Sequence, residues 1–261
     1  MHERERRLVN TQRIEAIPAW LARPRGNATA RLLARSDWLL RRKSDGRFLA
    51  ALAGDVVHSL DPSTLRPGNG VADALEALAG ASGGDVALDE DAPPYASLGI
   101  PGDYATLHAL STVDEPAELA LAGFDRYRRP LWLLAPAARA WLRMRDAARA
   151  DGIVLDAISG YRGHAYQLGI FERKLRRGQS IAQILTVNAA PGYSEHHSGR
   201  ALDIGTPGEP PAEESFEGTP AFAWLARRAW EFGFVMSYPR DNPHGITYEP
   251  WHFCWHPAPG R

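Results

Sequence analysis

The sequence predicts an α+β fold, in which short strands and helices alternate irregularly, rather than a doubly wound parallel sheet. Two observations lead to this class. Segments with apolar residues at helical spacing recur through the second half of the chain, and short apolar runs bounded by turn residues stand between them in no regular order. With 261 residues the chain suits one large domain or two small ones.

The expected elements of the second half can be placed one by one. Residues 131–150 carry apolar side chains at helical spacing, and Asp151-Gly152 ends that helix. A short strand is expected over 153–158, followed by a turn at Ser159-Gly160 and a helix over about 165–177. The remaining expected elements are a helix over 222–232 that ends at Gly233, and strands over 234–238 and 251–255.

Residues 1–104 are expected to form a smaller N-terminal region of unknown fold and function, and residues 105–261 the main domain. Within the first region, apolar runs at 38–41 and 47–50 flank Ser44-Asp45-Gly46. An Asp-Gly pair between two such runs predicts a β-hairpin.

The overall composition is that of an ordinary globular protein. It is 44% hydrophobic and 23% charged, and the formal net charge of -1 gives no reason to expect a nucleic-acid partner. Cys254 is the single cysteine, which excludes an intramolecular disulfide. There is no apolar run long enough to predict a membrane-spanning helix, and the N-terminal stretch lacks the apolar core of a signal peptide. A cytoplasmic location is therefore expected, or a periplasmic or exported one if the true leader is missing from this sequence.

Two short stretches carry the most specific chemistry in the chain. The range 194–203 reads Ser-Glu-His-His-Ser-Gly-Arg-Ala-Leu-Asp, and the range 249–252 reads Glu-Pro-Trp-His. A catalytic zinc site uses three protein ligands of these types, keeps one position for water, and has a carboxylate nearby to accept the proton of that water. The candidate zinc ligands are therefore His196, Asp203 and His252, and the candidate general base is Glu249.

The spacing of His196 and Asp203 excludes a regular helix or strand between them. Seven residues rise about 10.5 Å along a helix. Along a strand they span roughly 23 Å, with the two side chains on opposite faces. Neither arrangement lets both side chains reach one zinc ion at about 2.0–2.2 Å. The chain is expected to turn at Ser198-Gly199, where glycine tolerates positive φ, and to continue as a strand over 200–204.

The second stretch predicts a kink. Glu249 and His252 are an odd number of residues apart, so a regular strand would point them to opposite faces. Pro250 lies between them and cannot donate a hydrogen bond to a sheet. We therefore expect a kink at Pro250 that lets His252 bind zinc while Glu249 faces the metal-bound water.

Three neighbouring side chains are not expected to bind the metal. His197 adjoins a candidate ligand, so it is expected to point away and to pack or make a supporting hydrogen bond. Cys254 and His256 share the face of His252, but two residues along a strand is roughly 6.6 Å, which is too far for one ion. We assign both a structural role.

Both stretches resemble the signature of the VanY-type D-alanyl-D-alanine carboxypeptidases, Ser-x-His-x-x-Gly-x-Ala-x-Asp followed by Glu-x-Trp-His. Further similarity lies in Ser159-Gly160-Tyr161-Arg162, and the resemblance covers about residues 105–257. It implies a small, mostly antiparallel sheet that is flanked by helices and carries the zinc site, as in the fold group of lysostaphin, the D-Ala-D-Ala peptidases and the hedgehog domains.

Carried over position by position, the resemblance implies the same zinc ligands and the same general base. It also implies that Arg162 lies near the scissile carbonyl, where a guanidinium stabilises the developing oxyanion. Gln167 and Ser194 are candidates for holding the terminal carboxylate of the substrate, with local capping as the alternative. Gly163 and His164 depart from the family, which tends to have a hydroxyl residue after the arginine, and both are expected near the rim of the pocket. Phe253-Cys254-Trp255 also differs from the usual polar continuation and is expected in the same place.

The expected function is that of a zinc metallocarboxypeptidase that releases a terminal D-amino acid from a peptidoglycan-type peptide, as a D-alanyl-D-alanine or L,D-carboxypeptidase. The metal ligands indicate the reaction, and the resemblance alone indicates the D-configured substrate. Two alternatives stay open: an endopeptidase that cuts inside the stem peptide, and a non-catalytic zinc domain that binds a partner. A stem peptide or muropeptide is the expected substrate, and the oligomeric state stays open.

Overall fold

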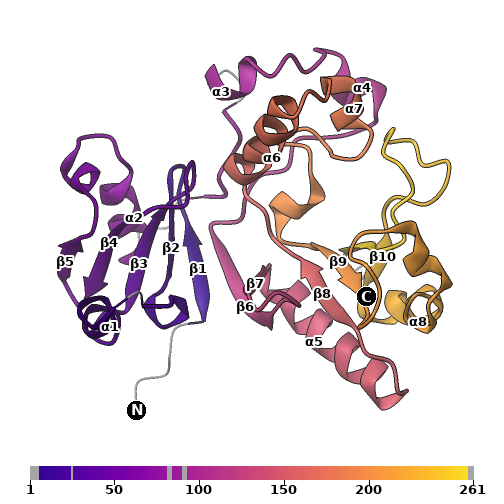
Figure 1. Cartoon of the computed structure of the whole chain (residues 1–261), viewed down its shortest axis with the longest axis horizontal. Helices are drawn as coiled ribbons and strands as arrows, with labels where there is room; N and C mark the ends of the chain where they lie inside the picture. Colours follow the sequence, from indigo (N-terminus) through magenta and orange to yellow (C-terminus); the bar gives the residue numbers. More distant parts are fainter. Residues whose placement is uncertain (1–5, 25, 81–83, 90–92, 258–261) are drawn as a thin grey trace. The chain divides into compact units, whose positions relative to one another are not determined.

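The computed structural model describes residues 6–24, 26–80, 84–89 and 93–257. The chain divides into two units (Figure 1). Met1–Ala87 and Glu115–Leu121 form the first, and Leu88–Asp114 and Ala122–Arg261 form the second. The expected division after residue 104 differs from these units in two respects, because residues 88–104 belong to the second unit and residues 115–121 return to the first.

The first unit is built on antiparallel strands, most of which follow one another along the chain. The strands are β1 (Arg7–Asn10), β2 (Ile14–Pro18), β3 (Trp38–Arg42), β4 (Phe48–Ala53), β5 (Val56–Ser59) and β6 (Glu118–Phe124), and the helices are α1 (Asn27–Leu33) and α2 (Val71–Leu78). The order of these strands in their sheet is β5-β4-β3-β2-β1-β6. Strand β7 (Pro130–Leu133) follows β6 along the chain and belongs to the second unit. The predicted hairpin is confirmed, since β3 and β4 pair antiparallel around Gly46, which has a φ of 70°.

Apolar residues from these strands and from α2 form the core of the first unit. Ile14, Leu40 and Leu49 of the strands are fully buried, and Val71 and Ala74 of α2 belong to the same cluster. The alternation of side chains along each strand places one face of the sheet against this core.

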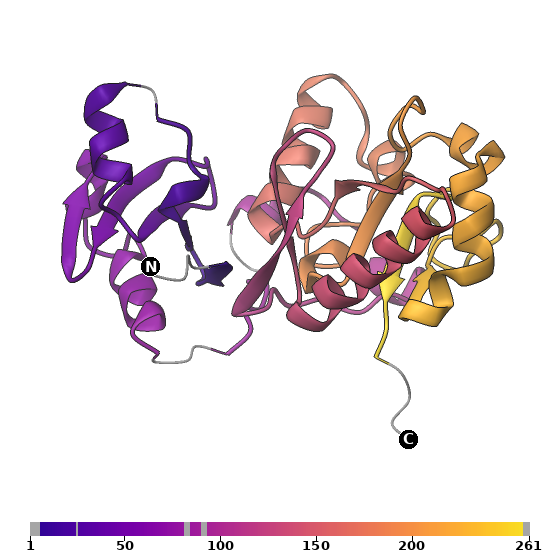
Figure 2. The same cartoon turned by 90° about the horizontal axis from the view of Figure 1, so that it is seen from below.

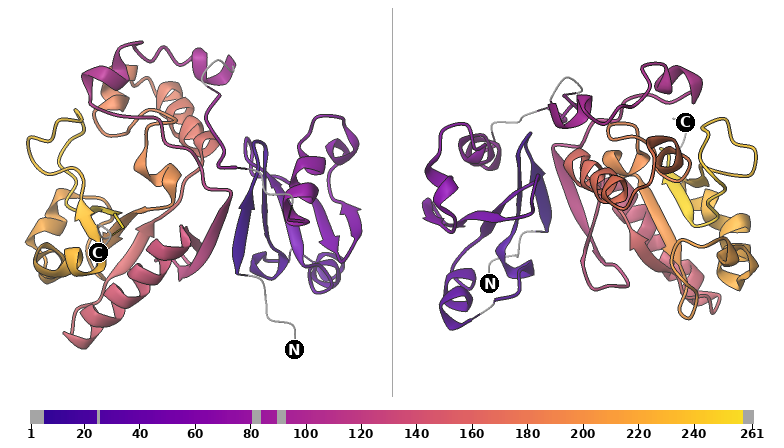
Figure 3. Two further views of the ribbon diagram at one scale, coloured as in Figure 1. Left: turned by 180° about the vertical axis from the view of Figure 1, so that it is seen from behind. Right: turned by 45° about the horizontal axis from the view of Figure 1, so that its top comes forward.

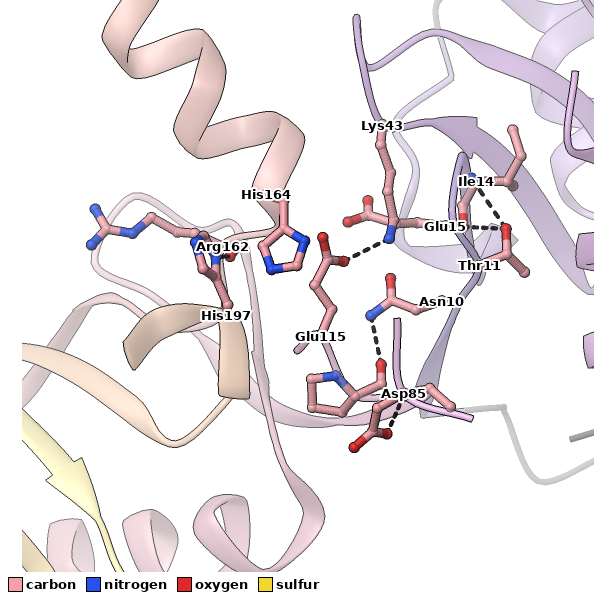
Figure 4. A network of polar contacts seen from close by, with 12 residues as sticks. Asn10, Thr11, Ile14, Glu15, Lys43, Asp85, Glu115, Arg162, His164 and His197 are labelled. Carbon is pink, nitrogen blue, oxygen red and sulfur yellow. Dashed lines mark hydrogen bonds and ion pairs between the residues drawn. The ribbon is translucent and has the colours of Figure 1, made fainter. Parts of the chain in front are cut away.

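A buried ion pair ties the returning segment 115–121 to the strands of the first unit. Lys43 Nζ lies 2.6 Å from Glu115 Oε2, and the two side chains are 5% and 2% exposed (Figure 4). Asn10 Nδ2 also donates to the carbonyl of Pro116. Removing one partner of such a pair would leave the other charge buried and unpaired.

The second unit contains a four-stranded antiparallel sheet in the order β10-β11-β9-β8. Its strands are β8 (Asp156–Ser159), β9 (Ala201–Gly205), β10 (Phe234–Met236) and β11 (His252–Trp255). The helices are α3 (Pro93–Ala96), α4 (Tyr104–Leu107), α5 (Ala135–Ala150), α6 (His164–Arg176), α7 (Ile181–Leu185) and α8 (Pro220–Arg228). This confirms the predicted α+β fold with a small antiparallel sheet flanked by helices. Throughout the described part of the chain, no helix has the length and apolar character that a membrane span needs.

Helix α5 lies along one side of this sheet (Figure 2), and one of its faces is apolar and buried. Ala137, Trp141, Met144 and Ala148 recur at spacings of three and four residues and are buried. The helix begins at Ala135 rather than at residue 131, because the preceding residues form β7 and because Pro136 suits the first turn of a helix.

The other predicted elements differ only at their ends. Strand β8 begins at Asp156 rather than at residue 153, because its pairing with β9 starts opposite Gly205. Helix α8 continues as a 3-10 turn (Ala229–Phe232) up to Gly233, where the predicted helix was expected to end. The long loop between β10 and β11 is visible at the right of the second view in Figure 3. That loop brings Glu249 and Pro250 to the start of β11.

The turn before β10 requires glycine at position 233. Gly233 has a φ of 83°, and a Cβ there would lie 2.8 Å from the carbonyl oxygen of His256. We expect Gly233→Ala to lower the free energy of unfolding by about 2–3 kcal/mol, because positive φ strains an L-residue and the clash is with backbone. Urea unfolding measures the change. Gly208→Ala is the matched control, since Gly208 has a φ of 86° and a Cβ there would meet nothing within 4 Å. Equal losses in the two variants would contradict the explanation by close approach.

Candidate metal centre and active site

The three predicted ligands come together on the four-stranded sheet. His196 lies on a 3-10 turn (Glu195–Ser198), Asp203 lies in the middle of β9, and His252 is the first residue of β11. The antiparallel register of β9 and β11 places His252 directly opposite Asp203. One ligand atom from each of the three side chains lies within 4.8 Å of the others. The structure therefore brings together residues that are far apart in the sequence.

Both local turns predicted from the sequence are present. Gly199 ends the 3-10 turn with a φ of 65°, and β9 starts two residues later. At the second stretch, the backbone N–H of His252 donates to the carbonyl of Glu249 at 3.1 Å, which closes a turn with Pro250 at its second position. The strand β11 begins only after this turn, so Glu249 and His252 are not held to opposite faces of one strand.

The nitrogen atoms of His196 have different surroundings, and these indicate a cation site. Nδ1 lies 2.7 Å from the carbonyl of Gly160, which assigns the ring proton to Nδ1. Nε2 is then an acceptor, and it lies 3.3 Å from Oδ1 of Asp203, which is an acceptor as well. This buried Nε2 has no hydrogen-bond partner among the described residues. Two buried acceptors that face each other in this way need a positive charge between them.

His252 completes the set with its Nδ1 atom. Nδ1 lies 3.1 Å from Oδ1 of Asp203, and Nε2 lies 2.8 Å from Oε2 of Glu195. The imidazole thus stands between two carboxylates. Two nitrogens and one carboxylate oxygen that converge in a buried place are ligands of the types that zinc binds in catalytic sites, so His196, Asp203 and His252 fit a zinc ion.

The pKa values of the three candidate ligands are shifted by burial and by the charged groups close to them. Burial and the nearby Arg162 guanidinium together lower the pKa of His196 to about 4, although Asp203 opposes the shift. Burial also acts to lower the pKa of His252, but the hydrogen bonds to Asp203 and Glu195 outweigh it and raise this pKa to about 10. Although burial acts to raise the pKa of Asp203, the two imidazoles hold it well below its usual range. Asp203 is therefore ionised, as a metal ligand must be.

Glu249 stands beside the three ligands rather than among them. Its Oε2 lies 3.8 Å from Nδ1 of His252, and its side chain is 14% exposed. Burial raises the pKa of Glu249 to about 7, and the nearby His252 opposes the rise. A carboxyl group with a pKa close to neutral pH can both accept and return a proton.

One cavity, with a volume of about 270 Å³, is lined by all seven residues predicted for the site. They are Arg162, Gln167, Ser194, His196, Asp203, Glu249 and His252. Arg162 Nε and Gln167 Oε1 are buried polar atoms with no hydrogen-bond partner in the described part of the chain. Gln167 Nε2 donates to the carbonyl of Ala189 at 2.8 Å, so Oε1 is the atom of this amide that has no partner within the described ranges.

The departures expected at the pocket rim lie elsewhere. His164 is 3% exposed, and Phe253 and Cys254 are buried in the core rather than at a rim, because β11 is an inner strand of the sheet. Gly163 precedes α6 as its N-cap residue. Neither these residues nor Trp255 line the cavity, so the expectation that they lie near the rim of the pocket is wrong.

The three residues that were not expected to bind the metal lie outside the candidate ligand group. Neither His197 nor Cys254 nor His256 belongs to the metal-binding group found among the described residues. His197 instead bonds the carbonyl of Arg162 through Nδ1 at 2.6 Å. Cys254 is buried opposite Ala201, and His256 is exposed.

Comparison with known proteins identifies the family. The family profile of VanY, described as D-alanyl-D-alanine carboxypeptidase, matches residues 131–258. The bifunctional D-Ala-D-Ala dipeptidase and D-Ala-D-Ala carboxypeptidase VanXYC of Enterococcus gallinarum is 31% identical over 153 residues, which cover 56% of this chain and 77% of that protein. The chain belongs to the VanY family.

Other carboxypeptidases are similar to the chain over shorter shares of their length. A D-alanyl-D-alanine carboxypeptidase of Enterococcus faecalis is 36% identical over 118 residues, which cover 41% of this chain and 42% of that protein. The structure of the LdcB LD-carboxypeptidase is 31% identical, with a TM-score of 0.50, and the match covers 54% of this chain and 69% of that one. The chain spans about half the length of some of the curated VanY relatives that it matches.

One residue that supports this VanY site was not predicted from the sequence. Glu195 precedes the ligand His196, yet it reaches across to His252, 57 residues away in the chain. Although burial acts to raise the pKa of Glu195, the hydrogen bond from His252 lowers it to about 2. Its position inside the first motif was visible, but only the fold shows that it faces the other histidine.

We expect Glu195→Gln to weaken zinc binding by about 10- to 100-fold, because a carboxylate behind a ligating imidazole orients the ring and raises its basicity. Competition with a chromogenic chelator measures the zinc affinity. Exposed Glu213 provides the matched control, because Glu213→Gln makes the same change of charge at a residue that does not line the cavity. An unchanged zinc affinity in Glu195→Gln would show that His252 needs no such support.

Proposed function

We propose that this chain is a zinc-dependent carboxypeptidase that hydrolyses the terminal peptide bond of peptidoglycan-type peptides and releases a D-amino acid. The observation that carries the proposal is the convergence of His196, Asp203 and His252 in one cavity with Glu249 beside them and not bound in the ligand set. The names of the relatives, which are D-Ala-D-Ala and LD-carboxypeptidases, support the D-configured substrate.

In the proposed reaction, His196, Asp203 and His252 hold the zinc ion. When bound, zinc supplies Lewis acidity, which lowers the pKa of a water molecule and polarises the scissile carbonyl. Glu249 accepts the proton of the attacking water on its carboxylate and returns it to the nitrogen of the departing amino acid. Arg162 directs its guanidinium at the negative charge that develops on the carbonyl oxygen.

The polar groups around the cavity support binding of a short peptide end. The volume of about 270 Å³ lies near the lower limit of ordinary ligand pockets, which suits the last residues of a peptide. Gln167 and Ser194 are buried and line the cavity, and we assign Ser194 to the terminal carboxylate of the substrate. Ser194 offers a hydroxyl donor for this purpose. The unpaired Oε1 of Gln167 accepts hydrogen bonds, so it suits an N–H of the substrate rather than its carboxylate.

Incubation of the zinc-loaded protein with muropeptides tests the proposal directly. One substrate ends in D-alanyl-D-alanine and the other carries a single D-alanine after an L-configured centre, so the two report D,D- and L,D-activity separately. We expect release of free D-alanine from at least one of them, detected by mass spectrometry. Products cut inside the stem peptide would instead identify an endopeptidase. No cleavage of either substrate at high enzyme concentration would overturn the peptidase proposal.

A further inference from the structure

The backbone N–H and carbonyl of Arg162 both form hydrogen bonds with the segment that contains the proposed zinc ligand His196. The backbone N–H of Arg162 donates to the carbonyl of His196 at 3.2 Å. The carbonyl of Arg162 lies 2.6 Å from Nδ1 of His197. The side chain, in contrast, has a buried Nε without a hydrogen-bond partner among the described residues. The place of the guanidinium therefore depends strongly on how the main chain of Arg162 is held.

The surroundings of His197 assign the role of each ring nitrogen. The side chain is fully buried. The backbone N–H of Gly192 donates to Nε2 at 3.1 Å, and a backbone N–H can only donate, so Nε2 is an acceptor. The ring proton is then on Nδ1, and Nδ1 donates to the carbonyl of Arg162. His197 is thus a neutral imidazole that links the backbone at 192 to the backbone at 162.

His164 holds this imidazole from the side. The two rings meet edge to face, with centroids 4.4 Å apart and an interplanar angle of 82° (Figure 4). Nε2 of His164 lies 2.7 Å from the carbonyl of Val113, and the N–H of Val113 donates to the carbonyl of Gly192 at 2.7 Å. The ring of His197 therefore packs against His164, which is itself held by a hydrogen bond. This packing fixes the orientation in which Nδ1 of His197 donates to the carbonyl of Arg162.

We propose that His197 is a positioning residue for Arg162, which holds the arginine main chain so that the guanidinium reaches the reacting carbonyl. The inference rests on the proposed function, because it gives Arg162 its purpose. His197 itself does not line the cavity and touches no reacting atom. It acts through the hydrogen bond from Nδ1 to the Arg162 carbonyl, in a buried place where water cannot substitute for it.

A pair of variants separates the two hydrogen bonds of His197. An asparagine amide occupies about the place of Nδ1, so His197→Asn keeps a donor for the carbonyl of Arg162. A glutamine amide reaches about the place of Nε2, so His197→Gln keeps the contact with Gly192. We expect kcat/KM of His197→Asn to stay within a few-fold of the unchanged protein and that of His197→Gln to fall by about 10- to 100-fold, mainly in kcat. The reverse order, or equal losses, would overturn the inference and assign His197 to supporting the backbone around Gly192.

A double-mutant cycle tests whether the effect passes through Arg162. In the Arg162→Ala background we expect His197→Gln to cause less than a twofold further loss of kcat/KM, because the group that it positions is gone. Full additivity of the two losses would overturn the positioning role. Exposed His256 provides matched controls, and we expect His256→Asn and His256→Gln to leave activity unchanged.

A measurement without catalysis keeps this inference separate from the proposed function. In nitrogen-15-labelled protein we expect a His197 ring proton that is bound to Nδ1 and protected from exchange, assigned by its loss in His197→Asn. A ring protonated on Nε2, or one that exchanges freely, would overturn the inference even in an active enzyme. If the protein releases no D-alanine from any muropeptide, the proposed function fails, and the ring signal still decides whether the contact with Arg162 exists.

Discussion

Glu249→Gln is expected to lower kcat for D-alanine release by about 10²- to 10⁴-fold while leaving the zinc content of the protein unchanged. Glutamine keeps the shape of the side chain but cannot accept a proton. Glu249 contributes no ligand atom to the group formed by His196, Asp203 and His252, so metal binding does not depend on its charge. Steady-state kinetics with a muropeptide substrate and elemental analysis of the same preparation measure the two quantities.

Exposed Glu213 again serves as the control for the change of charge, since Glu213→Gln alters no group in the cavity. Two results would contradict the assignment of Glu249 as the base. Activity within tenfold of the unchanged protein would mean that another group accepts the proton. Loss of zinc together with activity would mean that Glu249 is needed for the metal rather than for proton transfer.

The second large effect is expected at Asp203. Asp203→Asn is expected to weaken zinc binding by more than about 100-fold. Loss of a charged metal ligand costs more binding free energy than loss of a residue such as Glu195, which only hydrogen-bonds a ligand. Zinc also stabilises the fold that binds it, by about 2.7 kcal/mol at a free concentration 100 times the Kd. Chelation should therefore lower the Tm of the unchanged protein and leave the Tm of Asp203→Asn nearly constant.

Differential scanning fluorimetry with and without chelator measures this difference. Asp241→Asn is the matched control, because Asp241 is exposed and has a φ of 62°, a conformation that asparagine also adopts readily. We expect this control to respond to the chelator as the unchanged protein does. An Asp203→Asn protein that binds zinc with unchanged affinity would remove Asp203 from the ligand set.

Much of the site was predictable because it is encoded in short stretches with strict local geometry. The distance between His196 and Asp203 required a turn, and glycine at 199 was the residue able to make it. Proline at 250 likewise required an interruption before β11, and the observed turn from Glu249 to His252 is that interruption. The helices and strands of the second unit were predictable for a related reason, since periodicity reports which side chains one element buries.

The division of the chain was not predictable in the same way. Residues 115–121 return to the first unit because Glu115 pairs with Lys43 and because β6 pairs with β1. Both contacts join residues more than 70 positions apart in the sequence, and no local sequence pattern predicts such contacts. The burial of His164 was missed for a similar reason, because its partners Val113 and His197 come from other segments.

The residue types in the two short motifs are enough to specify the available chemistry: two imidazoles, a carboxylate for the metal and a second carboxylate for a proton. How these groups face one another depends on the folded chain. The register of β9 against β11 sets His252 opposite Asp203, and the same packing turns Glu195 toward the distant histidine and His197 toward Arg162. A motif specifies local geometry over a few residues. The direction of a buried side chain depends instead on which partner the folded chain places within hydrogen-bond reach, because buried polar groups need such a partner.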